Sequence, residues 1–292
     1  MAGWAGWTAD HAHRATSRQE YPPRWAGRQR CERPRFVNEQ LLAFVTGKSP
    51  AYLRAHTDEP IDPQTLAAYQ GLAERLEAGE PLAYIIGSAG FYRREFLVDS
   101  RVLIPRPETE HLVEAAIIFL RSRGPSRVLD VGTGSGAIAL TIAAEVPRAR
   151  VDAVDASPEA LVVAIENRQR LGLLDRRVAF YLGDLLEPVK QRRYDAIVAN
   201  LPYVPDGAGD PELCFEPAIA LYGGADGLDY YRRFFTSVPP MLNPGGLLLA
   251  EGAPPIAAGL FALARTAFPQ AAVTLERDYG GRERFIKVET PV

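Results

Sequence analysis

The segment VLDVGTGSGAIAL, residues 128–140, has the pattern of a buried strand, a glycine turn and the beginning of a helix. Glycine permits a tight turn and lets a ligand approach the backbone, while the first turn of a helix offers unpaired N–H groups. The loop alone does not identify a ligand, because Gly132, Gly134 and Ala137 also satisfy the G-x-G-x-x-[GA] fingerprint of dinucleotide-binding proteins. The alternative is a glycine turn that binds no ligand.

Strand-like and helical patterns alternate from Arg127 onward. The strand-like runs are RVLDVG (127–132), RVDAVDA (150–156), RVAFYLGD (177–184), YDAIVANL (194–201), GGLLLAEG (245–252), AAVTLERD (271–278) and RFIKVE (284–289). This order predicts an α/β fold with a parallel, doubly wound sheet. Only YGGRE (279–283) joins the last two runs, so we expect an antiparallel hairpin there. Six parallel strands and a reversed seventh are the arrangement of one large group of methyltransferases.

The first 104 residues divide into three parts. Residues 1–35 place three tryptophans and seven arginines among glycine and proline, which predicts a poorly ordered basic segment, with a basic arm or transit segment as the alternative. Residues 36–79 are helical in pattern, with Asp62 and Pro63 suited to cap and begin a helix, and predict a small helical domain. Residues 80–104 alternate as a β-hairpin linker would, ahead of a domain spanning 105–292.

Composition limits the classes of function. The chain has 292 residues, a net charge of −3 and a pI near 5.9, so no overall positive field draws it to nucleic acid or an anionic membrane. Cys31 and Cys214 have no metal-binding spacing, and we expect ordinary thiols, a reducing compartment and no metal. No apolar run approaches the roughly 20 residues that cross a bilayer, and the start lacks a signal-peptide core. We therefore expect a soluble, cytoplasmic protein.

Acidic residues follow the second and third strands of this sheet. Asp155, at the end of the second strand, can accept both hydroxyls of a ribose. Capping the next helix is its alternative role, but Ser157 and Pro158 already supply a cap and a first-turn residue, which leaves Asp155 free. Asp184 and Leu185 can line a base-binding pocket, although Asp184 is equally suited to a turn.

The fourth strand ends in Asn200-Leu201-Pro202-Tyr203, at the edge where ligands of such sheets react. The Asn side chain and the Leu201 carbonyl are acceptors, Pro202 fixes the backbone, and Tyr203 offers a flat ring. Two acceptors that converge on an –NH2 group predict a site for a carboxamide or an exocyclic amine. A simple turn after the strand is the structural alternative.

Such a nitrogen is a weak nucleophile because its lone pair is delocalised. Acceptors that draw both hydrogens aside favour a pyramidal nitrogen aimed at an electrophile, which would be a sulfonium methyl group, and alignment alone contributes roughly 7–11 kcal/mol. A general base is then not obligatory, and none of the four histidines is near this motif in the sequence.

With the glycine loop, Asp155 and Asn200–Tyr203, the chain resembles the PrmC/HemK family, the protein-glutamine methyltransferases that modify peptide-chain release factors. The resemblance covers about residues 80–290. Its other segments are GEPLAYIIGSAGFYRREFLVDSRVLIPRPETE (79–110), EPAIALYGGADGLDYYRRF (216–234) and RDYGGRERF (277–285). The implied fold is a class I S-adenosylmethionine-dependent methyltransferase, with a Rossmann-like sheet of seven strands whose last is antiparallel, plus a small N-terminal helical domain.

The resemblance also implies ligands. S-adenosyl-L-methionine is the implied methyl donor, bound by Gly132, Thr133, Gly134, Ser135, Gly136, Asp155, Leu185 and Asn200. The implied acceptor is the glutamine of the Gly-Gly-Gln motif of a release factor, bound at Asn200, Leu201, Pro202 and Tyr203. Asn200, Pro202 and Tyr203 are the implied catalytic residues. We expect residues 36–79 to recognise the release factor, and we expect a monomer that contacts neither nucleic acid nor membrane.

Two features depart from the family pattern. Residues 1–35 do not look like the opening helices of the family, and Leu201 replaces the first proline of its usual Asn-Pro-Pro-Tyr motif. Leucine keeps the backbone carbonyl and adds an N–H group. Asn-Leu-Pro-Tyr is also the motif of ribosomal RNA adenine dimethyltransferases, so the alternative is an adenine-N6 methyltransferase acting on RNA or DNA, which the neutral-to-acidic composition disfavours. The third hypothesis is a non-enzymatic module that binds S-adenosylmethionine or a nucleotide and serves in assembly.

Two further groups of residues have open roles. Arg106, Glu108 and Glu110 of PRPETE (105–110) either form an ion-pair network or flank the active site. Glu216 and Pro217 are expected in a loop on the substrate side, with no assigned role.

Overall fold

The computed structural model describes residues 35–174, 176–208, 211–278 and 280–292; residues 1–34 of the predicted basic segment, with Cys31, lie outside this range. The helices are α1 (Arg35–Thr46), α2 (Pro50–Ala55), α3 (Pro63–Glu77), α4 (Leu82–Ile86), α5 (Pro107–Arg121), α6 (Ala137–Glu145), α7 (Pro158–Arg170), α8 (Ala218–Leu221), α9 (Asp229–Ser237) and α10 (Pro254–Ala267). The strands are β1 (Ser88–Phe91), β2 (Arg94–Leu97), β3 (Ser126–Val131), β4 (Ala149–Asp155), β5 (Val178–Leu182), β6 (Tyr194–Ala199), β7 (Leu242–Glu251), β8 (Ala272–Arg277) and β9 (Glu283–Glu289). No helix in the described ranges is both long enough and apolar enough to cross a membrane.

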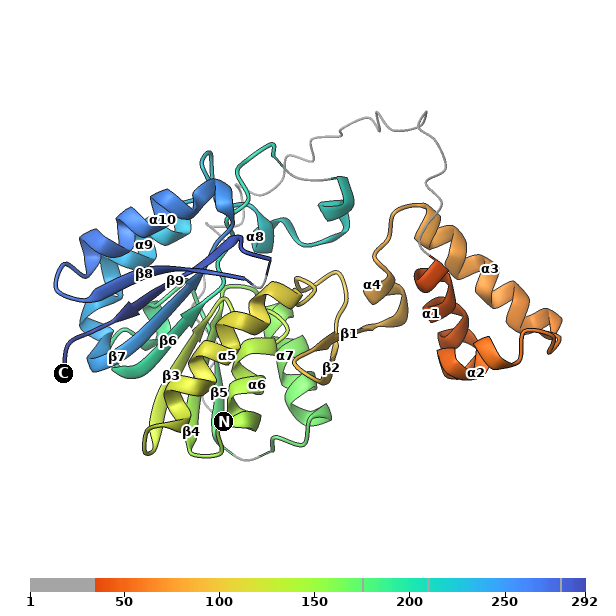
Figure 1. The fold of residues 1–292 in the computed structure, drawn as a ribbon, viewed down its shortest axis with the longest axis horizontal. Helices are drawn as coiled ribbons and strands as arrows, with labels where there is room; N and C mark the ends of the chain where they lie inside the picture. The colour runs from red at the N-terminus through yellow and green to blue at the C-terminus, as the bar shows by residue number, and fades with distance from the viewer. Residues whose placement is uncertain (1–34, 175, 209–210, 279) are drawn as a thin grey trace, which may run out of the picture.

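The main sheet has seven strands in the order β5-β4-β3-β6-β7-β9-β8 (Figure 1). Strands β3 to β7 pair in parallel, whereas β9 runs antiparallel to both of its neighbours, β7 and β8. The predicted parallel sheet and its terminal hairpin are therefore confirmed. The reversed strand β9 lies inside the sheet, and β8 forms its edge.

Two apolar layers cover this sheet, because its buried strands present side chains to both faces. Ala196 and Val198 of β6 pack in one layer with α5 and α6. Ile197 and Ala199 of the same strand pack in the other layer with α9 and α10. Successive apolar residues of β6 therefore face two different helical layers. Asn200 follows the end of this buried strand and leaves the core there.

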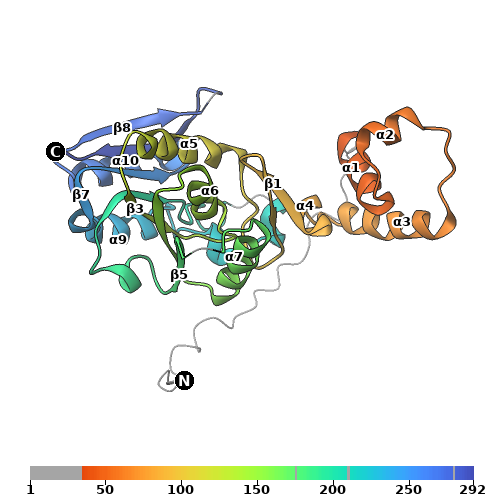
Figure 2. The ribbon, with the colours of Figure 1, turned by 90° about the horizontal axis from the view of Figure 1, so that it is seen from below.

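The N-terminal helices form a small unit of their own, which projects from one end of the molecule in both views (Figures 1 and 2). Its buried core consists of Leu41, Leu76 and Ile85. Asp62 caps α3 as predicted, since its side chain accepts hydrogen bonds from two backbone N–H groups of the first turn, and Pro63 follows it. The short hairpin β1–β2 then leads into α5, and the exact boundaries of the predicted domains stay a prediction.

The carboxyl ends of β3, β4, β5 and β6 meet at one edge of the sheet. Val131 pairs with both Val154 and Ala199, and Asp155 pairs with Leu182. The glycine loop, Asp155 and Asn200 therefore leave the sheet at the same level, where ligands of open α/β sheets bind.

Candidate active site

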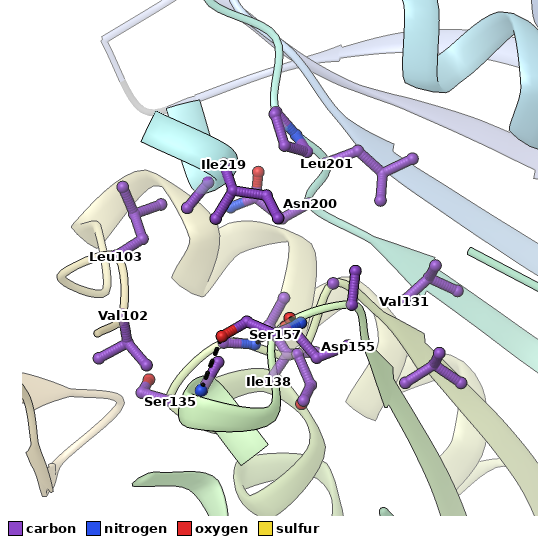
Figure 3. A pocket seen from close by; sticks show the side chains of 18 of the residues that line it. Val102, Leu103, Val131, Ser135, Ile138, Asp155, Ser157, Asn200, Leu201 and Ile219 are labelled. Atoms are coloured by element: carbon purple, nitrogen blue, oxygen red, sulfur yellow. Dashed lines mark hydrogen bonds between the residues drawn. The ribbon is translucent and has the colours of Figure 1, made fainter. Parts of the chain in front are cut away.

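A cavity lies over this edge and, with its mouth open to solvent, measures about 990 Å³. The predicted site residues that line it are Gly132, Thr133, Gly134, Ser135, Asp155, Asp184, Leu185, Asn200, Leu201 and Pro202. Figure 3 shows Asn200 on one side of it, with Ser135 and Asp155 on the other. Of the residues predicted for the site, only Gly136 and Tyr203 are absent from this lining.

The glycine loop is held to β4 by its own backbone. The N–H groups of Gly132 and Thr133 both donate to the Val154 carbonyl, at 2.9 and 3.0 Å. Gly132, Gly134 and Gly136 have φ angles of +76°, +53° and +81°, a region that favours glycine. A Cβ added to Gly134 would meet no atom within 4 Å, whereas one at Gly136 would come within 2.9 Å of Leu140 Cδ1. Gly134 therefore leaves space beside the loop, and Gly136 allows close packing of the helix.

Asp155 fixes this loop from the end of β4. Its Oδ2 accepts from the Gly134 N–H at 2.7 Å, and its Oδ1 accepts from the Ser157 N–H at 2.9 Å. Ser157 caps α7 as predicted, through a bond from Ala160 N to its hydroxyl. Asp155 was expected to be free, but it is not, because both of its carboxylate oxygens accept from backbone N–H groups. Each carboxylate oxygen has a second lone pair, so two further donors can still be accepted. Burial raises the pKa of Asp155, against the effect of these N–H groups.

Asp130, which the sequence analysis did not single out, lies beneath the same loop. It is fully buried, and its Oδ2 accepts from the Thr133 hydroxyl at 2.6 Å and from Ala139 N at 3.1 Å. Burial raises its pKa to about 7. Its only sequence signal is an acid inside an apolar strand. Asp130 therefore ties the loop to the first turn of α6.

Asp184 and Leu185 both line the cavity, after β5. Leu185 has a φ of +48°, which is unusual for a residue with a side chain. The half-exposed Asp184 carboxylate forms an ion pair with Arg233 of α9. Asp184 therefore borders the cavity and is held by an ion pair, while a contact with a base stays a prediction.

Asn200 lines the cavity, and a residue of α5, Thr109, bonds to its side-chain amide group. Its Nδ2 donates to the Thr109 hydroxyl oxygen at 3.3 Å, so the carboxamide oxygen is left for other contacts. The next residue, Leu201, donates its N–H to the Tyr231 hydroxyl at 3.2 Å, and Tyr231 in turn donates to the Glu251 carbonyl. The N–H that a proline would lack at position 201 is therefore used.

Tyr203 lies behind the cavity. Its hydroxyl donates to Glu251 Oε1 at 3.4 Å, and burial, with the nearby Glu251 carboxyl, raises the pKa of the phenol. Since Tyr203 does not line the cavity in the described part of the chain, a contact between its ring and an acceptor stays a prediction.

The predicted loops around Arg106 and Glu216 meet beside the cavity. Arg106 lines it and pairs with the buried Glu216, which also accepts from Ile104 N at 3.0 Å. Glu108 pairs with Arg284 at 3.4 Å, and Glu110 accepts from Tyr92 N at 2.9 Å. Arg106 therefore both flanks the site and forms an ion pair, whereas Glu108 and Glu110 belong to separate contacts.

Other lining residues were missed from the sequence. Thr109 lies in the first turn of α5, and apolar side chains such as Ile138 and Ile219 complete the wall. Thr109 lies inside the quoted segment PRPETE (105–110), but nothing in that segment indicates its contact with Asn200. Among the described residues, no group of three or more His, Cys, Asp or Glu could hold a metal ion.

The chain matches two domain families. Residues 27–87 match the PrmC N-terminal domain, and residues 111–215 match the methyltransferase small domain. A crystal structure of a methyltransferase from Pyrococcus furiosus superposes with a TM-score of 0.50 at 16% identity, covering 76% of this chain and 98% of that one. At that identity the similarity concerns the fold alone.

Two curated relatives are similar over most of their length. The release factor glutamine methyltransferase of Geobacter sulfurreducens is 42% identical over 224 residues, which span 75% of this chain and 77% of the relative. The Bacillus subtilis protein of the same name is 40% identical over 275 residues, 90% of this chain and 94% of the relative. Identity at this level over nine tenths of the chain, together with the fold, shows that this protein belongs to the release factor glutamine methyltransferase family.

Proposed function

We propose that this protein transfers the methyl group of S-adenosylmethionine to the side-chain amide nitrogen of the glutamine in the Gly-Gly-Gln motif of a peptide-chain release factor. The observation that carries the proposal is the position of Asn200. Its carboxamide lies across one cavity from the glycine loop, with Nδ2 held by Thr109 and Oδ1 left to accept a hydrogen bond.

The glycine-loop side of the cavity fits the methyl donor. Gly134 leaves open space beside the loop, and Asp155 has lone pairs for two hydroxyl groups. The residues that would hold the donor are Gly132–Gly136, Asp155, Leu185 and Asn200, with Gly136 acting through packing. When bound, S-adenosylmethionine supplies a methyl group on a positively charged sulfur.

The Asn200 side of the cavity fits the acceptor amide. Asn200 Oδ1 and the Leu201 carbonyl would accept the two N–H hydrogens of the glutamine side chain, which weakens the conjugation of its nitrogen. Pro202 lines the cavity and limits the motion of this segment. Transfer would form a bond between this nitrogen and the methyl carbon as the bond from that carbon to the sulfur breaks and its electron pair stays on the sulfur; the nitrogen would then lose one proton to solvent. These residues would orient the acceptor amide and form hydrogen bonds with it. Alignment of two reacting groups can lower a reaction barrier by roughly 7–11 kcal/mol.

The N-terminal helices, residues 36–79, are proposed to recognise the release factor. Several apolar side chains are exposed on this unit: Phe44 of α1, Leu66 of α3 and Ile61 of the loop before α3 each keep more than 40% of their surface accessible. Apolar side chains that stay in water on so small a unit are available for contact with a protein partner.

The function is tested by a transfer assay with three acceptors. The protein is incubated with methyl-labelled S-adenosylmethionine and, separately, an intact release factor, a factor whose motif ends in Gly-Gly-Ala, and bulk RNA. We expect label in the intact factor alone. Label in the RNA but not in the factor would support the adenine-N6 methyltransferase instead.

A further inference from the structure

Two arginines of the described chain line the cavity, and an acidic residue pairs with each of them. Arg106 pairs with Glu216, and Arg101 pairs with Asp99 at 2.6 Å. Proteins bind the phosphates of nucleic acids chiefly with arginine and lysine side chains, whose positive charge neutralises the phosphate. A cavity whose lining arginines are already paired suits an uncharged group, such as a polypeptide main chain, better than a phosphate.

Arg106 is held in place at the rim of the cavity. The Glu216 side chain is 2% exposed, and its Oε1 accepts from the Arg106 guanidinium while its Oε2 accepts from Ile104 N at 3.0 Å. Tyr84 of α4 holds the start of the same loop, since its buried hydroxyl donates to the Val102 carbonyl at 2.6 Å. The guanidinium therefore has a defined position before a substrate binds, which lowers the entropy cost of binding.

Most hydrogen-bond donors of Arg106 remain available. A guanidinium has five N–H donors in one rigid plane. Within the described part of the chain, Glu216 is the only hydrogen-bond partner of this side chain, 33% of which is accessible. Arg106 can therefore donate to a second acceptor in the cavity while Glu216 still holds it.

Arg106 also lies close to Asn200, through the first turn of α5. Its carbonyl accepts from the Thr109 N–H at 3.1 Å, and the Thr109 hydroxyl accepts from Asn200 Nδ2 at 3.3 Å. The side chain that Figure 3 shows beside Asn200 is the apolar and 53% exposed Ile219, which cannot bond to a peptide. A peptide extends about 3.3–3.6 Å per residue. When its glutamine reaches Asn200, the one or two residues next to that glutamine come near Arg106.

We propose that Arg106 is a substrate-binding residue, whose guanidinium donates to a main-chain carbonyl of the two glycines that precede the methylated glutamine. The inference rests on the proposed function for the identity of this peptide. Glycine has no side chain, so the carbonyl groups of a Gly-Gly segment are its main acceptors for recognition. Glu216 positions Arg106 and balances its charge, so that the pair binds a neutral carbonyl without attracting an anion.

The test measures the Kd of the release factor by calorimetry with S-adenosylhomocysteine present, which has no methyl group to transfer. Arg106→Lys keeps a cation beside the buried Glu216 but lacks the planar fork that can bond to Glu216 and a carbonyl together. Arg106→Met combined with Glu216→Gln is a second variant. It removes the guanidinium without leaving a buried carboxylate unpaired, and it keeps an acceptor for Ile104 N.

Arg94→Lys is the matched control. Arg94 lies outside the cavity lining, its side chain is 22% exposed, and it pairs with Glu145 at 2.8 Å. For every variant we also measure the Tm and the Kd of S-adenosylmethionine, which show whether the fold and the donor site are intact.

We expect both Arg106 variants to raise the Kd of the release factor about tenfold, the effect of one lost hydrogen bond from a charged group. The Kd of S-adenosylmethionine should not change, and Arg94→Lys should bind both ligands as the wild type does. A wild-type Kd for the factor in a folded Arg106 variant would overturn the proposal. An equal rise in the Kd of S-adenosylmethionine would also overturn it, because Arg106 would then contact the donor.

The same titrations with the Gly-Gly-Ala factor show which group Arg106 contacts. This factor keeps both glycine carbonyls and lacks the glutamine amide, so the Arg106 variants should weaken its binding by the same factor. Weaker binding of the intact factor alone would place the contact on the glutamine side chain and overturn the main-chain role. If the wild-type protein methylates no release factor, the proposed function fails and this inference fails with it, whereas transfer to the factor with an unchanged Kd in the Arg106 variants overturns the inference alone.

Discussion

The two walls of the cavity are built in different ways. On the glycine-loop wall, backbone groups of the loop bond to the neighbouring strand, and Asp155 adds two bonds to backbone N–H groups. On the Asn200 wall, the contacts come from side chains of three separate elements, namely Thr109 of α5, Tyr231 of α9 and Glu251 of β7. We name the glycine-loop wall the local wall, because its contacts join neighbouring segments of the sequence. We name the Asn200 wall the assembled wall, because the fold brings its contacts together from distant segments.

This difference separates the effects of substitutions. Changes to the local wall should alter donor affinity, because its loop is proposed to bind the donor. Changes to the assembled wall should alter turnover, even where the substituted residue touches no ligand. Substitutions on both walls, with matched controls, test how strictly the two effects are separated.

The largest effect is expected for Asn200→Ala, on the assembled wall. Removing the carboxamide deletes the oxygen proposed to align the acceptor, and a fraction of the roughly 7–11 kcal/mol available from alignment corresponds to a kcat loss of about a thousandfold or more. Calorimetry should show donor binding largely intact, because the glycine loop, Asp155 and Leu185 would still hold the donor. A near-normal rate in the transfer assay would remove Asn200 from the mechanism.

The sequence predicted the parts of this site that local patterns encode. The glycine spacing, the acid after the second strand and the polar turn after the fourth can each be recognised within about ten residues, and the alternation of elements places all of them at one sheet edge. The reversed terminal hairpin was also predictable, because five residues cannot form a crossover.

The supporting contacts could not be predicted in this way. Thr109 is 91 residues from Asn200, and Glu251 is 48 residues from Tyr203. A pattern within one segment does not show which other segment packs against it. Asp130 and Glu251 share one visible signal, an acidic residue in an otherwise apolar strand, which indicates a buried carboxyl but not its partner. The expectation that Asp155 is free failed for the same reason, since its bond to Gly134 spans 21 residues.

The next effect is expected for Asp155→Ala, on the local wall. The substitution leaves the Gly134 and Ser157 N–H groups without their acceptor and removes the proposed contact with the ribose. We expect the Kd of S-adenosylmethionine to rise about 30- to 100-fold, corresponding to about 2–3 kcal/mol.

Asp184→Ala is the matched control for Asp155→Ala. Its carboxylate also borders the cavity, but it is half exposed and paired with Arg233, so its loss should change the Kd less than about threefold. Equal effects of the two substitutions would show that Asp155 has no special place in donor binding.

A smaller effect is expected in the pH dependence of stability. Burial raises the pKa of Glu251 to about 7 from a usual value of 4.5. The folded protein therefore binds this proton more tightly than the unfolded chain, so the contribution to stability is complete below about pH 4.5 and is lost as the pH rises through about 7. Between about pH 5 and pH 8 this loss should lower the unfolding free energy of the wild-type protein by about 2 kcal/mol. We expect Glu251→Gln to lack that decrease.

Asp130 provides the counterpart on the local wall, since burial raises its pKa to about 7 as well. Denaturant titrations of Asp130→Asn should show a similar flattening of the pH profile. An unchanged profile in both variants would mean that these carboxyls titrate as in water, and the polar contacts beneath the two walls would then need revision.

The smallest effect is expected for Leu201→Pro, which restores the usual family motif. Proline keeps the carbonyl proposed to accept from the substrate, but it removes the N–H bond to Tyr231 and part of a side chain that is 3% exposed. We expect the unfolding free energy to fall by about 1–2 kcal/mol, with kcat within about fivefold of the wild-type value. Tyr231→Phe removes the same acceptor while keeping Leu201. Loss of all activity in a folded Leu201→Pro variant would show that the assembled wall depends on the Leu201 N–H group rather than on the Leu201 carbonyl.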